Sequence, residues 1–288
     1  MIKYKALLSL VYLTFMSSCS QEVTESKKQA QKQTNAAADT CGSLQITNGR
    51  KTKDEKYNAV AHLTIYDANE KKAFCTGTFI RQDLVLTAAH CFAGGNPSKV
   101  EITHTGGSTL GSNVKINELF FTKTPDTEGP YDLAVIKVSA AQNINSIPVC
   151  GFEPAIKDDG IILGYGRTAN KGDFTYGDLR EGFTEIAKLS NGVLQTYGSL
   201  TTTSGDGSFA STAYGDSGGP FLMTDNEGGL CIMALTHAGF EISHASGGVD
   251  NAHFTYLRSS IALDFFTKAG IQFNEKRSFT QSTDTCTP

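Results

Sequence analysis

Three segments far apart in the chain carry side chains that together could perform nucleophilic chemistry. The segment Gly215–Pro220 reads Gly-Asp-Ser-Gly-Gly-Pro and holds Ser217, the segment Leu86–Cys91 holds His90, and Asp132 begins a third segment. A serine hydroxyl is a poor nucleophile until an imidazole removes its proton, and the imidazole needs a carboxylate to hold its tautomer and stabilise its charge. Ser217, His90 and Asp132 are therefore the candidate catalytic residues of a hydrolase that works through an acyl intermediate.

The composition favours an all-β protein that could position these residues. The chain has 288 residues, 29 of them glycine, and only 19% are charged. This length can bury a sizeable core in one or two domains, and scattered short apolar runs suit strands better than a helical bundle. The formal net charge of −4 argues against a nucleic-acid partner, for which a basic stripe is expected.

The first residues are typical of an export signal. Met1–Lys5 is basic, and Ala6–Met16 is an apolar run that is shorter than the roughly 20 residues needed to span a bilayer. The small residues that follow, together with Cys19, resemble a bacterial lipobox. This resemblance implies a signal peptide over residues 1–19 and a lipid on Cys19, which would be the sole attachment to a membrane.

An ordinary signal peptide, cut near Ser18 or Ser20, is the alternative. In either case we expect an exported protein, either an outer-membrane or periplasmic lipoprotein or a secreted enzyme. Residues 20–45 are largely Gln, Lys, Thr, Ser and Ala, too polar to bury a core, and are predicted to be a flexible tether or propeptide. The folded domain is expected over residues 46–288.

Short apolar runs separated by turn residues predict strands from Cys41 onward. The runs are Val60–Tyr66, Phe74–Ile80, Leu84–Thr87, Leu133–Val138, Ile161–Leu163 and Leu230–Leu235. A helix is predicted after Ser259 or Ser260, either of which can cap it, and it should end at Gly270. Many short strands and a terminal helix indicate β-barrels rather than a parallel α/β sheet.

The chain resembles the chymotrypsin-type, or trypsin-like, serine peptidases. The resemblance rests on Gly-Asp-Ser-Gly-Gly-Pro around Ser217, on Thr-Ala-Ala-His-Cys around His90, and on the family order of His, Asp and Ser; it runs from about Ile46 to Phe266. It implies two six-stranded antiparallel β-barrels with a C-terminal α-helix. It also implies that Ser217 is the nucleophile, that His90 is the general base and that Asp132 orients His90, while the other histidines have structural roles. The N–H groups of Gly215 and Ser217 would form the oxyanion hole.

Disulfide bonds are expected because seven cysteines occur in an exported chain, and six remain once Cys19 is set aside for lipid. Their spacing leaves the connectivity open. The family resemblance implies one disulfide between Cys75 and Cys91 beside the histidine, and a second between Cys41 and Cys150 that retains a propeptide. Cys231 and Cys286 then pair by elimination.

The segment Cys41–Gly49 resembles the junction at which such enzymes are activated. Cleavage before Ile46 would free an amino group that inserts beside Asp216 and orders the oxyanion loop. The family's basic residue before the cut is Gln45 here, so an activating protease of another specificity, or self-cleavage, would be needed. The alternative is that Ile46 begins a strand and the chain is never processed.

The resemblance also places a specificity pocket. Ser211 lies where a trypsin-like preference for Arg or Lys requires Asp, so a buried cation would lack a counter-charge there. Thr236, Ala238 and Ala252 resemble the pocket walls, and His237 beside them departs from the family pattern. We expect cleavage after an uncharged, mainly apolar residue of small to medium size, while His237 could instead favour an acidic one.

Two other classes of protein remain as alternatives. One is an inert homologue that acts as a binding or regulatory protein, and the other is an esterase that uses the same triad. Esterases favour a Gly-x-Ser-x-Gly elbow with the histidine last in the chain, which differs from the order here. No metal-binding spacing, phosphate-binding loop or dense carboxylate cluster is evident, so no cofactor or metal is expected, and the partners are protein or peptide substrates.

Overall fold

The computed structural model describes residues 46, 49–139, 142–167, 177–199, 209–242 and 249–271. These residues form strands, short 3-10 helices and an α-helix. The strands are β1 Arg50–Lys51, β2 Val60–Tyr66, β3 Lys72–Arg81, β4 Leu84–Thr87, β5 Lys99–His104, β6 Gly107–Ile116, β7 Ala134–Val138, β8 Asp159–Gly164, β9 Arg180–Ser190, β10 Val193–Ser199, β11 Pro220–Thr224, β12 Leu230–Ile242 and β13 Val249–Tyr256. The helices are η1 Glu55–Tyr57, η2 Ala89–Phe92, η3 Phe120–Thr122, η4 Gly129–Tyr131 and α2 Ser260–Ala269. None of the helices in the described part of the chain is long and apolar enough to cross a membrane.

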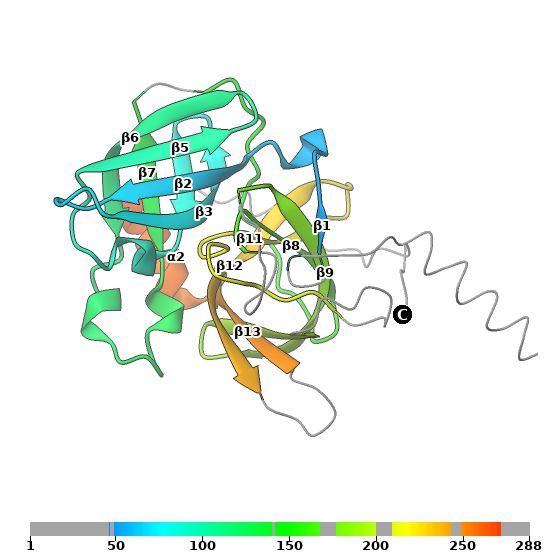
Figure 1. The fold of residues 1–288 in the computed structure, drawn as a ribbon. Coiled ribbons are helices and arrows are strands. Elements are labelled where there is room, and N and C mark those ends of the chain that lie inside the picture. Colours follow the sequence, from blue (N-terminus) through cyan, green and yellow to red (C-terminus); the bar gives the residue numbers. More distant parts are fainter. Residues whose placement is uncertain are drawn as a thin grey trace, which may run out of the picture. The chain divides into compact units, whose positions relative to one another are not determined.

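The first half of the chain forms a closed antiparallel barrel. Its strand order is β2-β3-β4-β7-β6-β5, and β5 returns to pair with β2 (Figure 1). Strands β2 and β5 alternate buried and more exposed residues, whereas β4 and most of β7 are buried. The apolar run predicted to be a buried strand after Asp132 is therefore β7, in the wall of this barrel.

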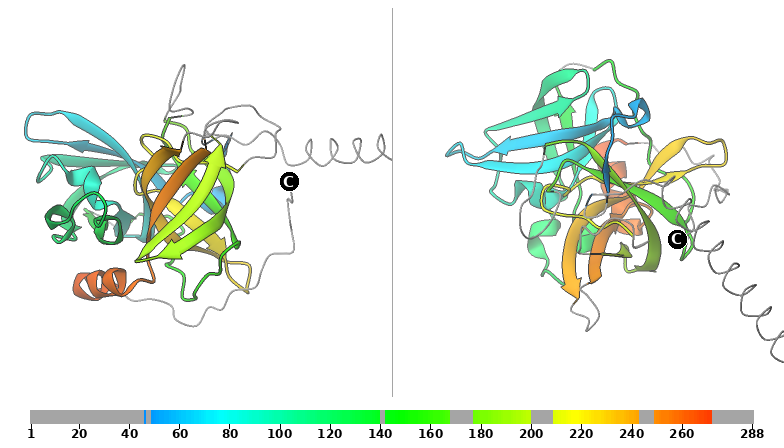
Figure 2. Two further views of the ribbon diagram at one scale, coloured as in Figure 1. Left: turned by 90° about the horizontal axis from the view of Figure 1, so that it is seen from below. Right: turned by 45° about the vertical axis from the view of Figure 1, so that its right-hand side comes forward.

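The second half forms another closed barrel. The strands follow the order β9-β10-β13-β12-β11-β8, and β8 pairs again with β9 to close the ring. Strand β1 pairs antiparallel with the first two residues of β9. Figure 2 shows β8 to β13, coloured green through yellow to orange, side by side around this barrel. The prediction of two six-stranded antiparallel barrels is thus confirmed.

Helix α2 follows the second barrel but packs with the core of the first. Ser259 caps it by accepting a hydrogen bond from the N–H of Ala262, and Gly270 ends it in the left-handed conformation, as the sequence predicts. Its buried residues Phe265 and Phe266 belong to the same hydrophobic cluster as Leu133, which precedes β7. Helix α2 therefore contributes to the core of the first barrel, next to the segment that carries Asp132.

One of the three expected disulfides is present in the structure, and the other two expected pairings differ from what the structure shows. Cys75 and Cys91 are bonded, with 6.3 Å between their Cα atoms. Cys150, however, is bonded to Cys231, with a Cα–Cα distance of 4.9 Å. A parallel bridge between Val149 and Ile232 sets the two cysteines side by side.

The Cys41–Cys150 and Cys231–Cys286 pairings are therefore wrong, since each sulfur can form only one disulfide. Cys41 and Cys286 lie outside the described residues, as do the signal peptide, Cys19 and the tether. The bridge that pairs Cys150 with Cys231 joins positions 81 residues apart, so it depends on how the barrel closes rather than on local spacing.

Removing the Cys150–Cys231 disulfide is expected to destabilise the fold. A double change, Cys150→Ala with Cys231→Ala, should lower the free energy of unfolding by about 2–4 kcal/mol, because it releases a long loop in the unfolded chain. Urea unfolding of the variant and the parent protein would measure the difference. A peptide map under non-reducing conditions that joined Cys41 to Cys150 would contradict the pairing.

Candidate active site

The candidate site lies where the two barrels meet. His90 belongs to η2, which follows β4 of the first barrel, and Asp132 lies just after η4, before β7. Ser217 belongs to the loop before β11 of the second barrel. Thr255 of β13 ties the two barrels together, since its hydroxyl donates to the carbonyl of Gly129 at 2.7 Å.

His90 and Asp132 are joined by two hydrogen bonds. The backbone N–H of His90 donates to Asp132 Oδ1 at 2.7 Å, and His90 Nδ1 lies 2.6 Å from Asp132 Oδ2. The Asp132 side chain is fully buried, whereas 28% of the His90 side chain is exposed. A carboxylate held in this way fixes the Nδ1–H tautomer and leaves Nε2 as the basic nitrogen.

The charges of this pair shift both pKa values. Burial acts to lower the pKa of His90, but the charge and hydrogen bond of Asp132, with Glu128 nearby, raise it above its ordinary value. Burial acts to raise the pKa of Asp132, but the charge of His90 and the hydrogen bonds from His237 and His90 hold it well below its ordinary value. Asp132 is therefore ionised at neutral pH, and His90 is a stronger base than a free imidazole.

Ser217 lies against the disulfide that adjoins His90. The Ser217 carbonyl accepts a hydrogen bond from the N–H of Thr76 at 2.8 Å, and Cys91 Sγ lies 3.9 Å from the same oxygen. Within the described residues the Ser217 hydroxyl makes no hydrogen bond. A transfer of its proton to His90 Nε2 would therefore need a hydrogen bond between Ser217 Oγ and Nε2 to form when a substrate binds.

The turn around Ser217 requires glycine on both sides. Gly215 has a φ of +97° and Gly218 a φ of +77°, a region that residues with a Cβ rarely adopt. A Cβ on Gly218 would also lie 2.1 Å from the Thr87 hydroxyl oxygen. In the part of the chain that the structure describes, the N–H groups of Gly215 and Ser217 donate to no backbone carbonyl, so both are available to a ligand.

The side chain of Asp216 is buried and is held by backbone hydrogen bonds. Its two carboxylate oxygens accept the N–H groups of Gly166 and Ala213, each at 2.8 Å. Burial raises the pKa of Asp216 to about 7, against the effect of these hydrogen bonds. Ile46, the expected new amino terminus, is also buried, in the hydrophobic cluster of the second barrel.

The expected pocket residues lie on the second barrel and are uncharged. Ser211 lies against Gly198 of β10, since a Cβ on Gly198 would be 2.7 Å from the Ser211 Cβ. Ala252 of β13 pairs with Gly239 of β12. Ser211 and Ala252 are fully buried, Thr236 is 4% exposed and Ala238 is half-buried.

The sequence did not indicate that His237 contacts Asp132. Its Nδ1 lies 2.5 Å from Asp132 Oδ2, the same oxygen that His90 contacts. The expectation that the histidines other than His90 have structural roles gave no reason to place His237 beside the candidate triad, whereas the structure brings it into direct contact with Asp132. Its departure from the family pattern was the available signal, but that signal pointed to the pocket edge.

Two groups of side chains have the donor atoms that metals prefer. In the first, Cys75 and Cys91 are bonded to each other, so their sulfurs are not thiolates. In the second, the nitrogen atoms of His90 and His237 lie 2.6 and 2.5 Å from Asp132 Oδ2. Ligand atoms bound tetrahedrally to one zinc lie about 3.3 Å apart, given bonds of about 2.0 Å. These shorter distances fit hydrogen bonds, and we assign no metal to either group.

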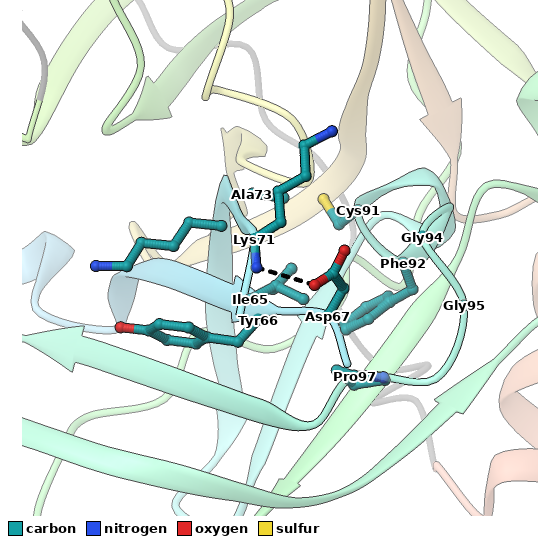
Figure 3. A pocket seen from close by; sticks show the side chains of 11 residues that line it. Ile65, Tyr66, Asp67, Lys71, Ala73, Cys91, Phe92, Gly94, Gly95 and Pro97 are labelled. Atoms are coloured by element: carbon teal, nitrogen blue, oxygen red, sulfur yellow. Dashed lines mark hydrogen bonds between the residues drawn. The ribbon is translucent and has the colours of Figure 1, made fainter. Parts of the chain in front are cut away.

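A cavity of roughly 190 Å³ adjoins the Cys75–Cys91 disulfide (Figure 3). Ile65, Phe92 and Cys91 are among the residues that line it, together with Lys71 and Lys72. Figure 3 shows the carboxylate of Asp67 accepting the backbone N–H of Lys71, at 2.9 Å. Cys91 also contacts the backbone carbonyl of Ser217, but Ser217, His90 and Asp132 are not among the residues that line this cavity.

Comparisons with known proteins agree with this fold. The chain is 32% identical to trypsin theta of Drosophila melanogaster over 32% of this chain and 38% of that protein. It is 26% identical to a trypsin of Saccharopolyspora erythraea over 53% of this chain and 71% of that protein. The first match thus spans less than half the length of its relative.

Two solved structures share the fold. HL collagenase has a TM-score of 0.59 and 18% identity over 78% of this chain and 99% of its own. A Glu endopeptidase has a TM-score of 0.55 and 17% identity over 77% of this chain and 96% of its own. The model of the trypsin family matches residues 46–257. With two closed barrels and a match over most of its length, the chain belongs to the trypsin family of serine proteases.

Proposed function

We propose that this protein is an exported serine endopeptidase whose catalytic triad is Ser217, His90 and Asp132. The observation that carries the proposal is the buried Asp132 carboxylate, which holds His90 with two hydrogen bonds beside the Ser217 turn. The available N–H groups of Gly215 and Ser217 support an oxyanion hole. A binding protein would need neither a base with a raised pKa nor open backbone donors next to a serine.

The proposed reaction has two steps. In the first, the Ser217 hydroxyl gives its proton to His90 Nε2 while Oγ attacks the carbonyl carbon of the peptide bond, and the oxyanion accepts the N–H groups of Gly215 and Ser217. The C–N bond then breaks, and the leaving amine takes the proton from His90. In the second step a water molecule gives a proton to His90 and attacks the acyl carbon, and Ser217 regains its proton as the acid leaves.

Labelling with a fluorophosphonate probe tests for the activated serine. We expect a single labelled site, at Ser217, and faster hydrolysis of casein than of simple carboxylic esters. An unlabelled, inactive protein would favour the inert binding homologue. A labelled protein that cuts esters but not casein would favour the esterase.

The pH at which activity appears should follow the raised pKa of His90. Because the base must be neutral, we expect kcat/KM to rise with pH with a midpoint above the ordinary value of 6.5. While Asp132 is ionised, its attraction for protonated His90 stabilises the fold in full below the pKa that His90 has in the unfolded chain. This contribution is lost as pH rises through the higher pKa of His90 in the folded protein. A pH profile of kcat/KM at constant ionic strength measures the midpoint, and a value below 6.5 would contradict the assignment of His90 as base.

We further propose that the substrate residue before the cleaved bond is uncharged and of small to medium size. Ser211, Thr236, Ala238 and Ala252 carry no charge, and two of them are fully buried, so a cation placed among them would lack a counter-charge from these four. Matched chromogenic peptides ending in Ala, Val, Leu, Arg and Glu would test this. Fastest cleavage after Arg would overturn it, and fastest cleavage after Glu would support the acidic alternative.

Activation by cleavage before Ile46 remains our proposal. Asp216 is buried with a raised pKa, so an ammonium group placed beside it would stabilise its ionised form. Mass spectrometry of the active protein should find a chain that begins at Ile46. The same measurement reports the fate of Cys19, and a fully active chain that begins at Cys19 or Ser20 would contradict activation at this site.

A further inference from the structure

Asp132 is shared by two imidazoles on opposite barrels. His90 Nδ1 reaches Asp132 Oδ2 at 2.6 Å from the first barrel, and His237 Nδ1 reaches the same oxygen at 2.5 Å from β12 of the second. The His237 side chain is only 7% exposed. Its ring lies edge-on to that of His90, with 5.9 Å between ring centroids.

An irregularity in the sheet aims His237 at Asp132. In the pairing of β12 with β13, Thr236 lies opposite Phe254 and Ala238 opposite His253, so His237 is the extra residue of a bulge. The neighbouring hydroxyl of Thr236 is buried without a hydrogen-bond partner. The Asp132 carboxylate is therefore hydrogen-bonded by the imidazole of His237 and not by the hydroxyl of Thr236.

The hydrogen-bond inventory of Asp132 assigns the tautomer of His237. Asp132 Oδ1 accepts the backbone N–H of His90, and Oδ2 has two lone pairs for the two ring nitrogens. An ionised carboxylate can only accept, so both Nδ1 atoms must carry hydrogen. His237 thus donates its Nδ1–H to the same oxygen that accepts the Nδ1–H of His90.

We propose that His237 is a positioning residue of the active site, which fixes the Asp132 carboxylate from the second barrel and moderates the basicity of His90. This inference rests on the proposed function for its kinetic consequences. A hydrogen bond to Oδ2 draws negative charge away from His90, whether the His237 ring is neutral or charged. Removing that bond should therefore strengthen the attraction between Asp132 and protonated His90 and raise the pKa of His90.

Other ionisable groups near these rings come from several elements. Glu128, before η4, raises the pKa of His90 through its charge. His253 of β13 lies opposite Ala238, and burial lowers its pKa, as do the charges of His237 and of Lys188 on β9. Within the described residues none of these groups donates a hydrogen bond to the Asp132 carboxylate, so they form a constant background in a comparison of His237 variants.

Two substitutions separate positioning from packing. His237→Phe keeps a ring but loses the donor, whereas His237→Asn places an amide N–H where Nδ1 now lies. We expect His237→Phe to lower kcat about tenfold, as for one hydrogen bond to a charged group, with KM little changed. The acid limb of kcat/KM should move up by about half a unit to one unit. His237→Asn should restore most of the activity and return the acid limb towards the parent value.

His104→Phe is the matched control. His104 is another buried histidine, in the first barrel, and its Nδ1 accepts the N–H of Gly106 rather than contacting Asp132. This variant reports what the loss of any buried imidazole costs. Thermal unfolding of all variants shows which of them are folded under the conditions of the assay.

An NMR titration of His90 makes the test independent of catalysis. Measured in a Ser217→Ala background, the pKa of His90 should be higher with His237→Phe and close to the parent value with His237→Asn. Equal effects of Phe and Asn on kcat, with an unmoved acid limb and an unmoved His90 pKa, would overturn the proposal. A parent protein that neither reacts with a fluorophosphonate nor cuts casein would instead refute the proposed function, and the titration would still decide the role of His237.

Discussion

Replacing Ser217 by alanine is expected to lower kcat about a million-fold. The change removes the atom that attacks the substrate, and a water molecule attacking directly gains little from His90 without a positioned nucleophile. The residual rate comes from the oxyanion donors of Gly215 and Ser217, which are backbone groups and survive the substitution.

The same substitution should leave the fold almost untouched. Ser217 is half-buried and its hydroxyl makes no hydrogen bond within the described residues, so the free energy of unfolding should change by less than about 0.5 kcal/mol. Ser112→Ala, at an exposed position of β6 where the hydroxyl donates to the Lys137 carbonyl, controls for the loss of a serine hydroxyl away from the site. Hydrolysis and fluorophosphonate labelling that persist in Ser217→Ala would place the nucleophile elsewhere.

Asp132→Asn is expected to lower kcat about ten-thousand-fold near neutral pH. Three N–H donors converge on this carboxylate, namely the backbone and Nδ1 of His90 and Nδ1 of His237. An amide offers one acceptor oxygen and one NH₂ group, so whichever way it turns, a donor faces a donor. When the NH₂ group takes the place of Oδ2, His90 can face it as an acceptor only by moving its proton to Nε2, and that tautomer cannot accept the serine proton.

This substitution should also destabilise the fold, because a buried donor left without an acceptor costs about 1–3 kcal/mol. Asp159→Asn makes the same chemical change at an exposed position of β8 and controls for the loss of one negative charge. Steady-state kinetics with urea unfolding on both variants would measure the two effects. Activity of Asp132→Asn within tenfold of the parent enzyme would contradict the role assigned to Asp132.

Several elements could be predicted because their signals are local. The apolar run after Asp132 became β7, and the serine and glycine at the ends of α2 cap it as expected. Capping depends on residues within one turn, and a buried strand shows itself as a continuous apolar segment. The placement of Ser217 next to a glycine with positive φ likewise follows from a short motif whose turn only glycine allows.

Other strands could not be predicted from pattern alone. The strand β6 is exposed or half-buried along its whole length, so no apolar alternation marks it. It exists because it pairs with β5 and β7, and those hydrogen bonds depend on the closed barrel rather than on the side chains of β6. The same reason explains why β12 extends to Ile242, well beyond the apolar run that predicted it.

The amino-acid sequence by itself determined the chemical groups of the site, namely a serine, a histidine and an aspartate in the motifs described above. It also determined the glycines that permit the turn around Ser217. Only the tertiary structure decided which distant residues touch. The barrel bridge paired Cys150 with Cys231, and the bulge in β12 turned His237 onto Asp132. Strand register sets both contacts, and register comes from the closure of the whole barrel, which no short segment encodes.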